Sequence, residues 1–247
     1  MIHSIVTSAW INMKNLRFQL LQYLMLVVVF PCSYLLISVF SNAGERNLTC
    51  YVVSLFCSML MSLFINMEAV MIANSNAISV IEQYATFQVS PLYVHMGSSL
   101  YHGILSVPLL LVSAVWLGLL YGQLHIVYIA IAFLLSLAFL PAVAMILGGL
   151  FRNPNIASPI ISMFYMIIMM LTPFYSQFDA LSDTARILFC VNPFAHLLSL
   201  YYMGFGETGI CHPLISVLIL AALCALLWLA SVRRWLKPTA VEKLNMF

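Results

Sequence analysis

The side chains that could do chemistry are few in this chain, and the clearest is a carboxylate inside an apolar stretch. Of the 247 residues, 64% are hydrophobic and only 6% are charged. Glu68 lies in Asn66-Met67-Glu68-Ala69, near one end of a long apolar run. Such a residue either binds a cation or lines a polar cavity, or its role is structural, as an interfacial carboxylate or as a hydrogen-bond partner between helices. Its position near the end of the run favours the structural interpretation.

A second polar segment lies between two apolar runs. It reads Ile81-Glu82-Gln83-Tyr84-Ala85-Thr86-Phe87-Gln88-Val89-Ser90-Pro91-Leu92. Glu82 can cap the start of a short amphipathic helix, in which Gln83 and Gln88 stay polar. Pro91 is expected to end this helix, because proline disfavours the helical conformation of the residue before it. In so apolar a chain, a polar segment of this length indicates contact with something soluble. The alternative is an ordinary solvated connection.

The sequence lacks the common catalytic patterns. It has no His-Glu-x-x-His helix, no Gly-x-Ser-x-Gly turn and no Cys/His spacing typical of zinc sites. The phosphate-cradling Gly-x-x-x-x-Gly-Lys-Ser/Thr loop is also missing, so we expect neither enzymatic activity nor ATP binding by a P-loop. We expect no directly bound cofactor or metal. The basic residues flank the apolar runs, which argues against a nucleic-acid partner. Transport is the class of function that remains.

Six apolar runs reach or approach the length that crosses a bilayer. A hydrocarbon core of roughly 30 Å needs about 20 mostly apolar residues in a helix. Lipid offers no hydrogen-bond partner to an open backbone, so these runs are expected to be helices. The sequence therefore predicts an all-α, polytopic membrane protein. Its six predicted transmembrane helices are residues 20–40, 51–73, 100–120, 126–147, 156–173 and 213–230.

The distribution of basic residues predicts the orientation. Arg46 and Arg186 fall on one side of the predicted spans, and the remaining basic residues fall on the other: Lys14, Arg17, Arg152, Arg233, Arg234, Lys237 and Lys243. Positive residues mark the cytoplasmic side of a membrane. Both termini are therefore expected in the cytoplasm, with the chain as a multi-pass protein of the plasma membrane, which in a bacterium is the cytoplasmic membrane.

The whole chain, 1–247, is interpreted as one transmembrane domain. Apolar residues at helical spacing around Trp10 predict an interfacial helix over residues 1–17. Spans one to five fill 18–173, an outer segment fills 174–212, span six is 213–230, and 231–247 is a cytoplasmic tail. Three cysteines are expected at or beyond the outer surface, where two of them could pair without a unique assignment: Cys50, Cys190 and Cys211.

The outer segment has the signals of two short helices. Ser182 precedes Asp183-Thr184-Ala185-Arg186-Ile187-Leu188-Phe189, which predicts a capped helix. Asn192-Pro193 then breaks the chain before a second helix over 194–202. Each helix is about half the length needed to span the bilayer.

These motifs, in this order, resemble those of the type-2 ABC transporter permeases. In that family the loop after the second span typically reads Glu-x-x-x-Gly-Thr-Leu, followed by an apolar run and Ser-Pro. The residues that match here are Glu82, Thr86, Phe87, Ser90 and Pro91. Ala85 replaces the glycine, and the apolar run is shorter. The stretch from Gly148 to Asn155 resembles the family's loop between spans four and five, and Asn192-Pro193 resembles its Asn-Pro before the last span.

The resemblance implies a permease subunit of an ATP-driven exporter. Two copies, or one copy with a sibling permease, would pair with two cytoplasmic ABC ATPase subunits, which carry ATP and Mg. The resemblance makes residues 82–89 a coupling helix that docks on the ATPase, with contacts from Glu82, Gln83, Thr86, Phe87, Gln88, Ser90 and Pro91. A second cytoplasmic loop would place Phe151, Arg152 and Asn153 near the same partner.

The resemblance also implies two short helices around Asn192 and Pro193 that dip partly back into the membrane over the outer exit. They would form either an outer gate or a lid that packs the bundle. The cargo would be amphipathic or hydrophobic, such as a drug, peptide, lipid or lipid-linked glycan. An ATPase-independent protein is the alternative: a secondary carrier that uses Glu68, or a membrane scaffold.

Overall fold

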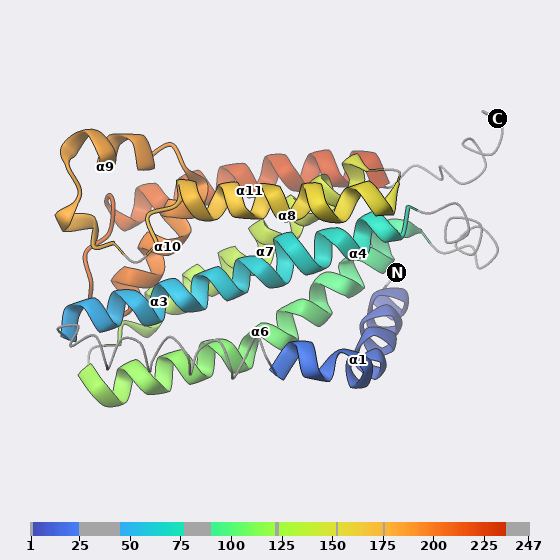
Figure 1. The fold of residues 1–247 in the computed structure, drawn as a ribbon, viewed down its shortest axis with the longest axis horizontal. Helices are drawn as coiled ribbons and strands as arrows, with labels where there is room; N and C mark the ends of the chain where they lie inside the picture. Colours follow the sequence, from blue (N-terminus) through green and yellow to red (C-terminus); the bar gives the residue numbers. More distant parts are fainter. Residues whose placement is uncertain are drawn as a thin grey trace.

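The computed structural model describes residues 2–24, 45–76, 90–121, 124–151, 153–174 and 176–235, and over these ranges it is helical with no strand. The all-α prediction is therefore confirmed for the described residues. Most of the long helices lie side by side in a bundle (Figure 1). The elements are α1 (Ile2–Leu24), α3 (Glu45–Met61), the π-helix η2 (Ser62–Glu68), α4 (Ala69–Asn74), α6 (Pro91–Tyr121), α7 (Ile126–Leu150), α8 (Pro154–Leu171), the 3-10 turn η3 (Phe178–Ala180), α9 (Asp183–Phe189), α10 (Pro193–Gly204) and α11 (Pro213–Trp235).

Long apolar helices indicate a membrane protein, as the composition predicts. In the part of the chain that the structure describes, four helices are long and apolar enough to cross a membrane: Leu48–Asn74, Pro91–Val115, Ile126–Leu150 and Pro213–Arg233. They correspond to predicted spans two, three, four and six. Predicted span five is present as a shorter apolar helix, Asn155–Leu171. Predicted span one, 20–40, lies mostly outside the described residues.

The central helix of the bundle is α7. It contacts α4, η2, α10 and α11, as well as α6 and α8. A helix that is apolar all round is typical of a membrane span or a buried core, and α7 has this composition. The helix comes close to α4 at Gly148, where an added Cβ would lie 2.5 Å from the carbonyl oxygen of Ala69. Glycine therefore permits the close approach of these two backbones.

Predicted span two is one continuous helix with a π-helical segment inside it. The π-helix Ser62–Glu68 joins α3 to α4, and both of its flanking residues keep right-handed helical backbone angles. Segments of this kind often occur at functional sites. Here the segment ends at Glu68, the carboxylate singled out from the sequence.

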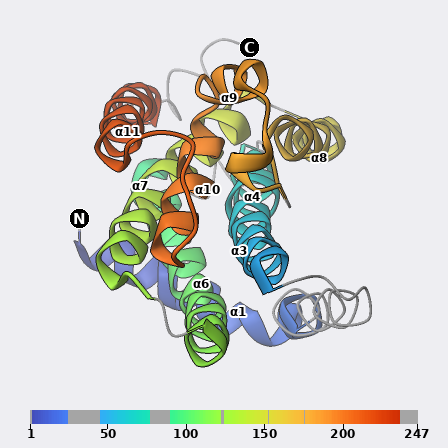
Figure 2. The same cartoon turned by 90° about the vertical axis from the view of Figure 1, so that its left-hand side faces the viewer.

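The N-terminal helix α1 is longer than the predicted interfacial helix, because it continues past residue 17 to Leu24. Its main neighbour is α6, and Figure 2 shows it running crosswise to the bundle. Ser8 lies against α6 and Ala9 is buried, whereas Val6 and Trp10 are exposed. Lys14 Nζ lies 5.4 Å from the Trp10 ring centroid. An exposed apolar and basic surface of this kind suits a membrane interface.

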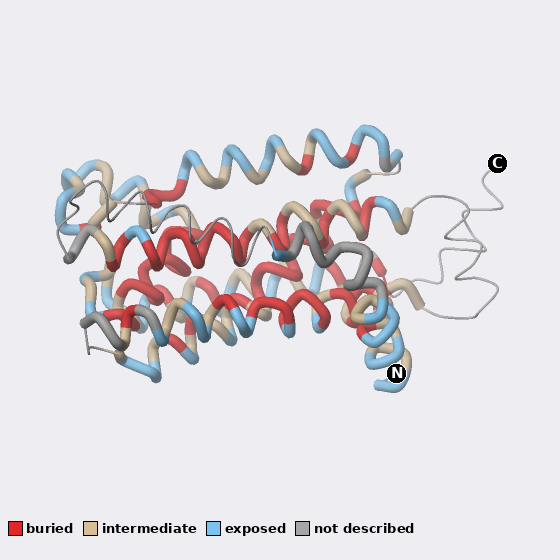
Figure 3. The backbone as a smooth tube through the Cα atoms, turned by 60° about the horizontal axis from the view of Figure 1, so that its bottom comes forward, coloured by how far each residue is buried: buried red, intermediate tan, exposed pale blue. Residues whose placement is uncertain are grey.

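The two ends of the bundle differ. Helices α9 and α10 lie at one end, and α1 lies at the other, together with the end of α4, the start of α6 and the end of α11 (Figure 1). Buried residues follow the inner sides of the long helices, while their outer sides are largely exposed (Figure 3). The α1 end is the one that the basic residues assign to the cytoplasm, and we refer to it below as the α1 end.

Candidate functional site

The predicted coupling segment lies largely outside the described residues, so Glu82, Gln83, Thr86, Phe87 and Gln88 stay predictions. Its two ends are described. The chain leaves α4 through a turn at Asn76 and re-enters at Ser90, which is not helical.

Pro91 begins α6, so span three starts earlier than residue 100, where the sequence placed it. Proline is well tolerated as the first residue of a helix, because its missing N–H has no partner there in any case. The polar residues of the first two turns of α6 had suggested a connection outside the membrane.

Asn76 joins the two loops that the sequence placed in the cytoplasm. Its side-chain nitrogen donates to the carbonyl oxygens of Gly148, at 3.1 Å, and of Phe151, at 2.9 Å. Both carbonyls belong to the C-terminal end of α7, where helical partners run out. The base of the predicted coupling segment is thereby attached to the second predicted loop.

The second predicted loop is short, and its described residues are well anchored. Phe151 is half-buried and packs against the core. Asn153 is exposed and caps α8, since its Oδ1 accepts from the backbone N–H of Asn155 at 3.0 Å. Pro154 follows as the first helical residue. Arg152 lies outside the described residues. Phe151 and Asn153 therefore have structural roles here, and their contact with a partner stays a prediction.

Two further contacts hold the α1 end together, and neither was predicted. Ser8 Oγ donates to the carbonyl oxygen of Val94 at 3.1 Å, and an added Cβ at Gly97 would lie 2.5 Å from Ser8 Cβ. The rings of His95 and Trp235 meet edge to face with centroids 4.5 Å apart. Small residues are typical of close helix contacts in membranes, but a single sequence does not tell which helix they face.

Glu68 is fully buried between η2 and α6. Ser99 Oγ donates to Glu68 Oε1 at 2.5 Å. This is the helix–helix hydrogen bond that the structural interpretation describes. Oε2, however, has no hydrogen-bond partner among the described residues. A buried polar atom without a partner is costly, and each one calls for an explanation.

His102 lies next to this unpartnered oxygen without bonding to it. Its Nδ1 is 3.8 Å from Glu68 Oε2 and 3.0 Å from the carbonyl oxygen of Ser98. The shorter contact is a hydrogen bond when Nδ1 carries the proton. The sequence pointed to Glu68 alone. Ser99 and His102 lie one turn apart on α6; Ser99 comes just before predicted span three, 100–120, and His102 falls inside it.

The outer segment contains the two helices that were expected. Ser182 Oγ accepts from the backbone N–H of Ala185 and caps α9. Helices α9 and α10 meet at an angle of 108°, with Asn192-Pro193 between them. Asn192 Oδ1 caps α10 by accepting from the N–H of Phe194 at 3.0 Å. Its Nδ2 donates to the carbonyl oxygen of Leu171, at the end of α8, at 2.8 Å. That these helices dip into the membrane stays a prediction.

Helix α10 fills the interior of the bundle at its end. Tyr201 and Tyr202 are fully buried, and their hydroxyls pair with Ser136 Oγ at 2.9 Å and with Ser54 Oγ at 2.7 Å. These bonds fix α10 to α7 and α3. In the described part of the chain, the cysteines of this end are not joined by disulfides: Cys50, Cys190 and Cys211.

In the described part of the chain, no cluster of three or more His, Cys, Asp or Glu residues is arranged to hold a metal. A comparison with protein-family models found no match. A comparison with curated proteins also found none. The resemblance to type-2 ABC permeases therefore depends on the motifs of the sequence.

Proposed function

We propose that this chain is the membrane-spanning permease subunit of an ATP-driven ABC exporter. It moves an amphipathic or hydrophobic cargo out of the cytoplasm, and ATP and Mg bind to a separate ATPase subunit. The observation that carries the proposal is the attachment of Asn76 to Gly148 and Phe151. The segment with the family-like Glu82 motif starts from a base that is fixed to a second loop at the same end of the bundle.

The physical reason is mechanical. ATP stabilises a closed ATPase dimer, and a permease must transmit that rigid-body movement to its spans. A coupling segment on a loose loop would absorb the movement. A segment whose base is hydrogen-bonded to α7, the helix that contacts most of the others, passes it to the bundle. A second permease copy or a sibling permease completes the transporter within the lipid bilayer.

Crosslinking tests the docking. A cysteine at Gln83 is expected to crosslink to an ATPase subunit that co-purifies with the full-length chain. Glu82→Lys is expected to abolish ATP-dependent export, while membrane insertion stays normal. Asp183→Lys makes the same charge reversal on the exposed start of α9, at the opposite end, and should leave export unchanged. Normal export by the Glu82→Lys variant would contradict the coupling role.

A secondary carrier is the second candidate, and the buried Glu68 beside His102 favours it. Intramembrane ionisable residues often mark ion pathways. Reconstitution in vesicles without any ATPase, under an imposed proton or sodium gradient, distinguishes a secondary carrier from an ATP-driven exporter. Gradient-driven transport that is lost in Glu68→Gln would support the carrier. Transport that requires an ATPase and persists in Glu68→Gln would support the exporter.

A further inference from the structure

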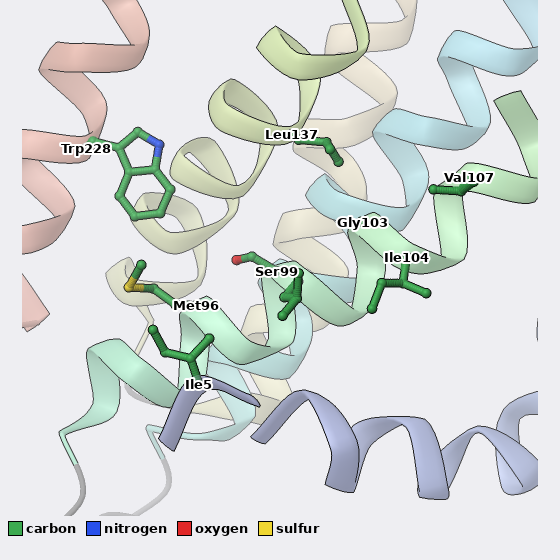
Figure 4. Close-up of a pocket in the computed structure, with 9 residues that line it drawn as sticks. Ile5, Met96, Ser99, Gly103, Ile104, Val107, Leu137 and Trp228 are labelled. Carbon is green, nitrogen blue, oxygen red and sulfur yellow. The ribbon is translucent and has the colours of Figure 1, made fainter. Parts of the chain in front are cut away.

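A groove of about 410 Å³ runs along the side of the bundle, between α1, α6, α7 and α11 (Figure 4). Its size lies in the range of roughly 300–1,000 Å³ that is usual for small-molecule sites. The walls are almost wholly apolar, with contributions from Ile5, Met96, Ile104, Val107, Leu137 and Trp228. The indole N–H of Trp228 donates to the carbonyl oxygen of Ala138 at 2.7 Å, so it cannot donate to a molecule in the groove.

The groove is open to the surroundings of the bundle. Leu100, Ile104 and Val107 form its rim on α6 and are 44%, 45% and 40% exposed. The floor includes Gly103, where an added Cβ would lie 3.2 Å from Leu137 Cδ2. The rim belongs to a helix long and apolar enough to span the membrane, and the groove ends beside α1. A molecule dissolved in the bilayer can therefore reach it from the side.

Ser99 is the polar residue of the wall, and its hydrogen is already committed. Ser99 Oγ donates to Glu68 Oε1 at 2.5 Å, which is shorter than its 3.0 Å contact with the carbonyl oxygen of His95. A hydroxyl has one hydrogen and two acceptor lone pairs. Ser99 can therefore only accept a hydrogen bond from a molecule in the groove. Figure 4 shows the Ser99 oxygen directed toward the side of Trp228 and Met96.

The carboxyl group of Glu68 lies directly behind this acceptor, and a cation bound in the groove would favour its ionised form. The carboxyl group is fully buried directly behind Ser99, and Oε2 is unpartnered among the described residues. Among the described residues, no ion pair joins Glu68 to a Lys or Arg, and the titratable group beside it is His102, with Nδ1 3.8 Å from Oε2. Apolar walls strengthen electrostatic attraction, because they lower the local dielectric constant. The site favours a cationic donor and disfavours an anionic group.

We propose that this groove binds a hydrophobic amine. Its ammonium donates to Ser99 Oγ in front of Glu68, and its hydrocarbon chain lies against Ile104, Val107 and Leu137. The arrangement matches the usual division of a ligand site into an apolar body and a few polar groups that fix the orientation. This inference concerns binding and does not depend on an ATPase partner.

Photoaffinity labelling of the full-length protein in phosphatidylcholine nanodiscs tests the site. The probe is dodecylamine with a terminal diazirine, and the comparison probe is the dodecanol of the same length. The amine is expected to label residues 96–107. Glu68→Gln removes the carboxyl charge behind Ser99 and is expected to weaken amine labelling about tenfold, which corresponds to about 1.4 kcal/mol. Labelling by the alcohol should hardly change.

Three variants sharpen the test. Ser99→Ala removes the acceptor and should weaken amine labelling, whereas Ser136→Ala, a buried serine on α7 that does not line the groove, should not. Ile104→Trp fills the rim at a partly exposed position and should block both probes. Equal labelling of wild type and Glu68→Gln by the amine would overturn the proposal. Equal labelling of the wild type by the amine and the alcohol would also overturn it, because the groove would then bind a neutral hydrocarbon chain. Absence of label from residues 96–107 would also overturn it.

Discussion

At the scale of single residues, the polar side chains discussed above act mainly by hydrogen bonds that join one helix to another. Asn76 fastens the loop after α4 to the end of α7, and Ser99 joins α6 to Glu68 of η2. In a membrane protein the helices gain little from hydrophobic association, since lipid is as apolar as the bundle. Packing and interhelical hydrogen bonds then decide which helices stay together. Such ties position a site even when they take no part in its chemistry.

Asn76→Ala should lower the stability of the purified protein. The variant removes two hydrogen bonds at the end of α7, although Gly148 keeps its 3.4 Å contact with the backbone N–H of Phe151. Each lost bond contributes on the order of 0.5–1.5 kcal/mol. The measurement is thermal unfolding in detergent, with Asn74→Ala as the control, because Asn74 is exposed at the end of α4. If both variants unfolded at the same temperature as wild type, the hydrogen bonds of Asn76 would not stabilise the fold. If the proposed function holds, ATP-dependent export should also fall in Asn76→Ala.

At the scale of elements, local signals predicted helices better than they predicted the ends of spans. Ser182 and Asp183 mark the start of α9 because a cap acts within one turn. The start of α6 at Pro91 was missed because His95, Ser98 and Ser99 lower the apolar character of its first turns. These side chains are tolerated because the fold places them inward: His95 and Ser98 are buried, and Ser99 reaches Glu68. Contacts between distant segments cannot be read from one sequence.

The bend between α9 and α10 depends on both polar atoms of the Asn192 side-chain amide. Asn192→Asp keeps an oxygen that caps Phe194 N–H but loses the N–H that reaches Leu171. Asn192→Ala loses both. A lost cap typically costs about 0.5–2 kcal/mol, so Asn192→Ala should unfold at a lower temperature than Asn192→Asp, and Asn192→Asp below wild type. If the alanine and aspartate variants unfolded together, the cap would not stabilise α10.

At the scale of the whole molecule, the bundle has one end built from α1 and the loop bases, and another closed by α9 and α10. The positive-inside rule orients these ends from the sequence, and the helices place the predicted inner loops together. Asn153 is exposed near the first end, and Ile187 is 71% exposed on α9. These two positions therefore report opposite sides of the membrane if the bundle spans it.

Labelling with a membrane-impermeant maleimide tests this topology. In a cysteine-free background, a cysteine at Ile187 is expected to react on intact right-side-out cells, because α9 lies at the end assigned to the outside. A cysteine at Asn153 should react only after the membrane is permeabilised. Permeabilised cells serve as the control, since both positions are exposed and should then react. Labelling of both positions on intact cells would mean that α8 does not cross the bilayer or that α9 lies on the same side as Asn153. The coupling segment and the outer gate would then lack the opposite faces that export requires.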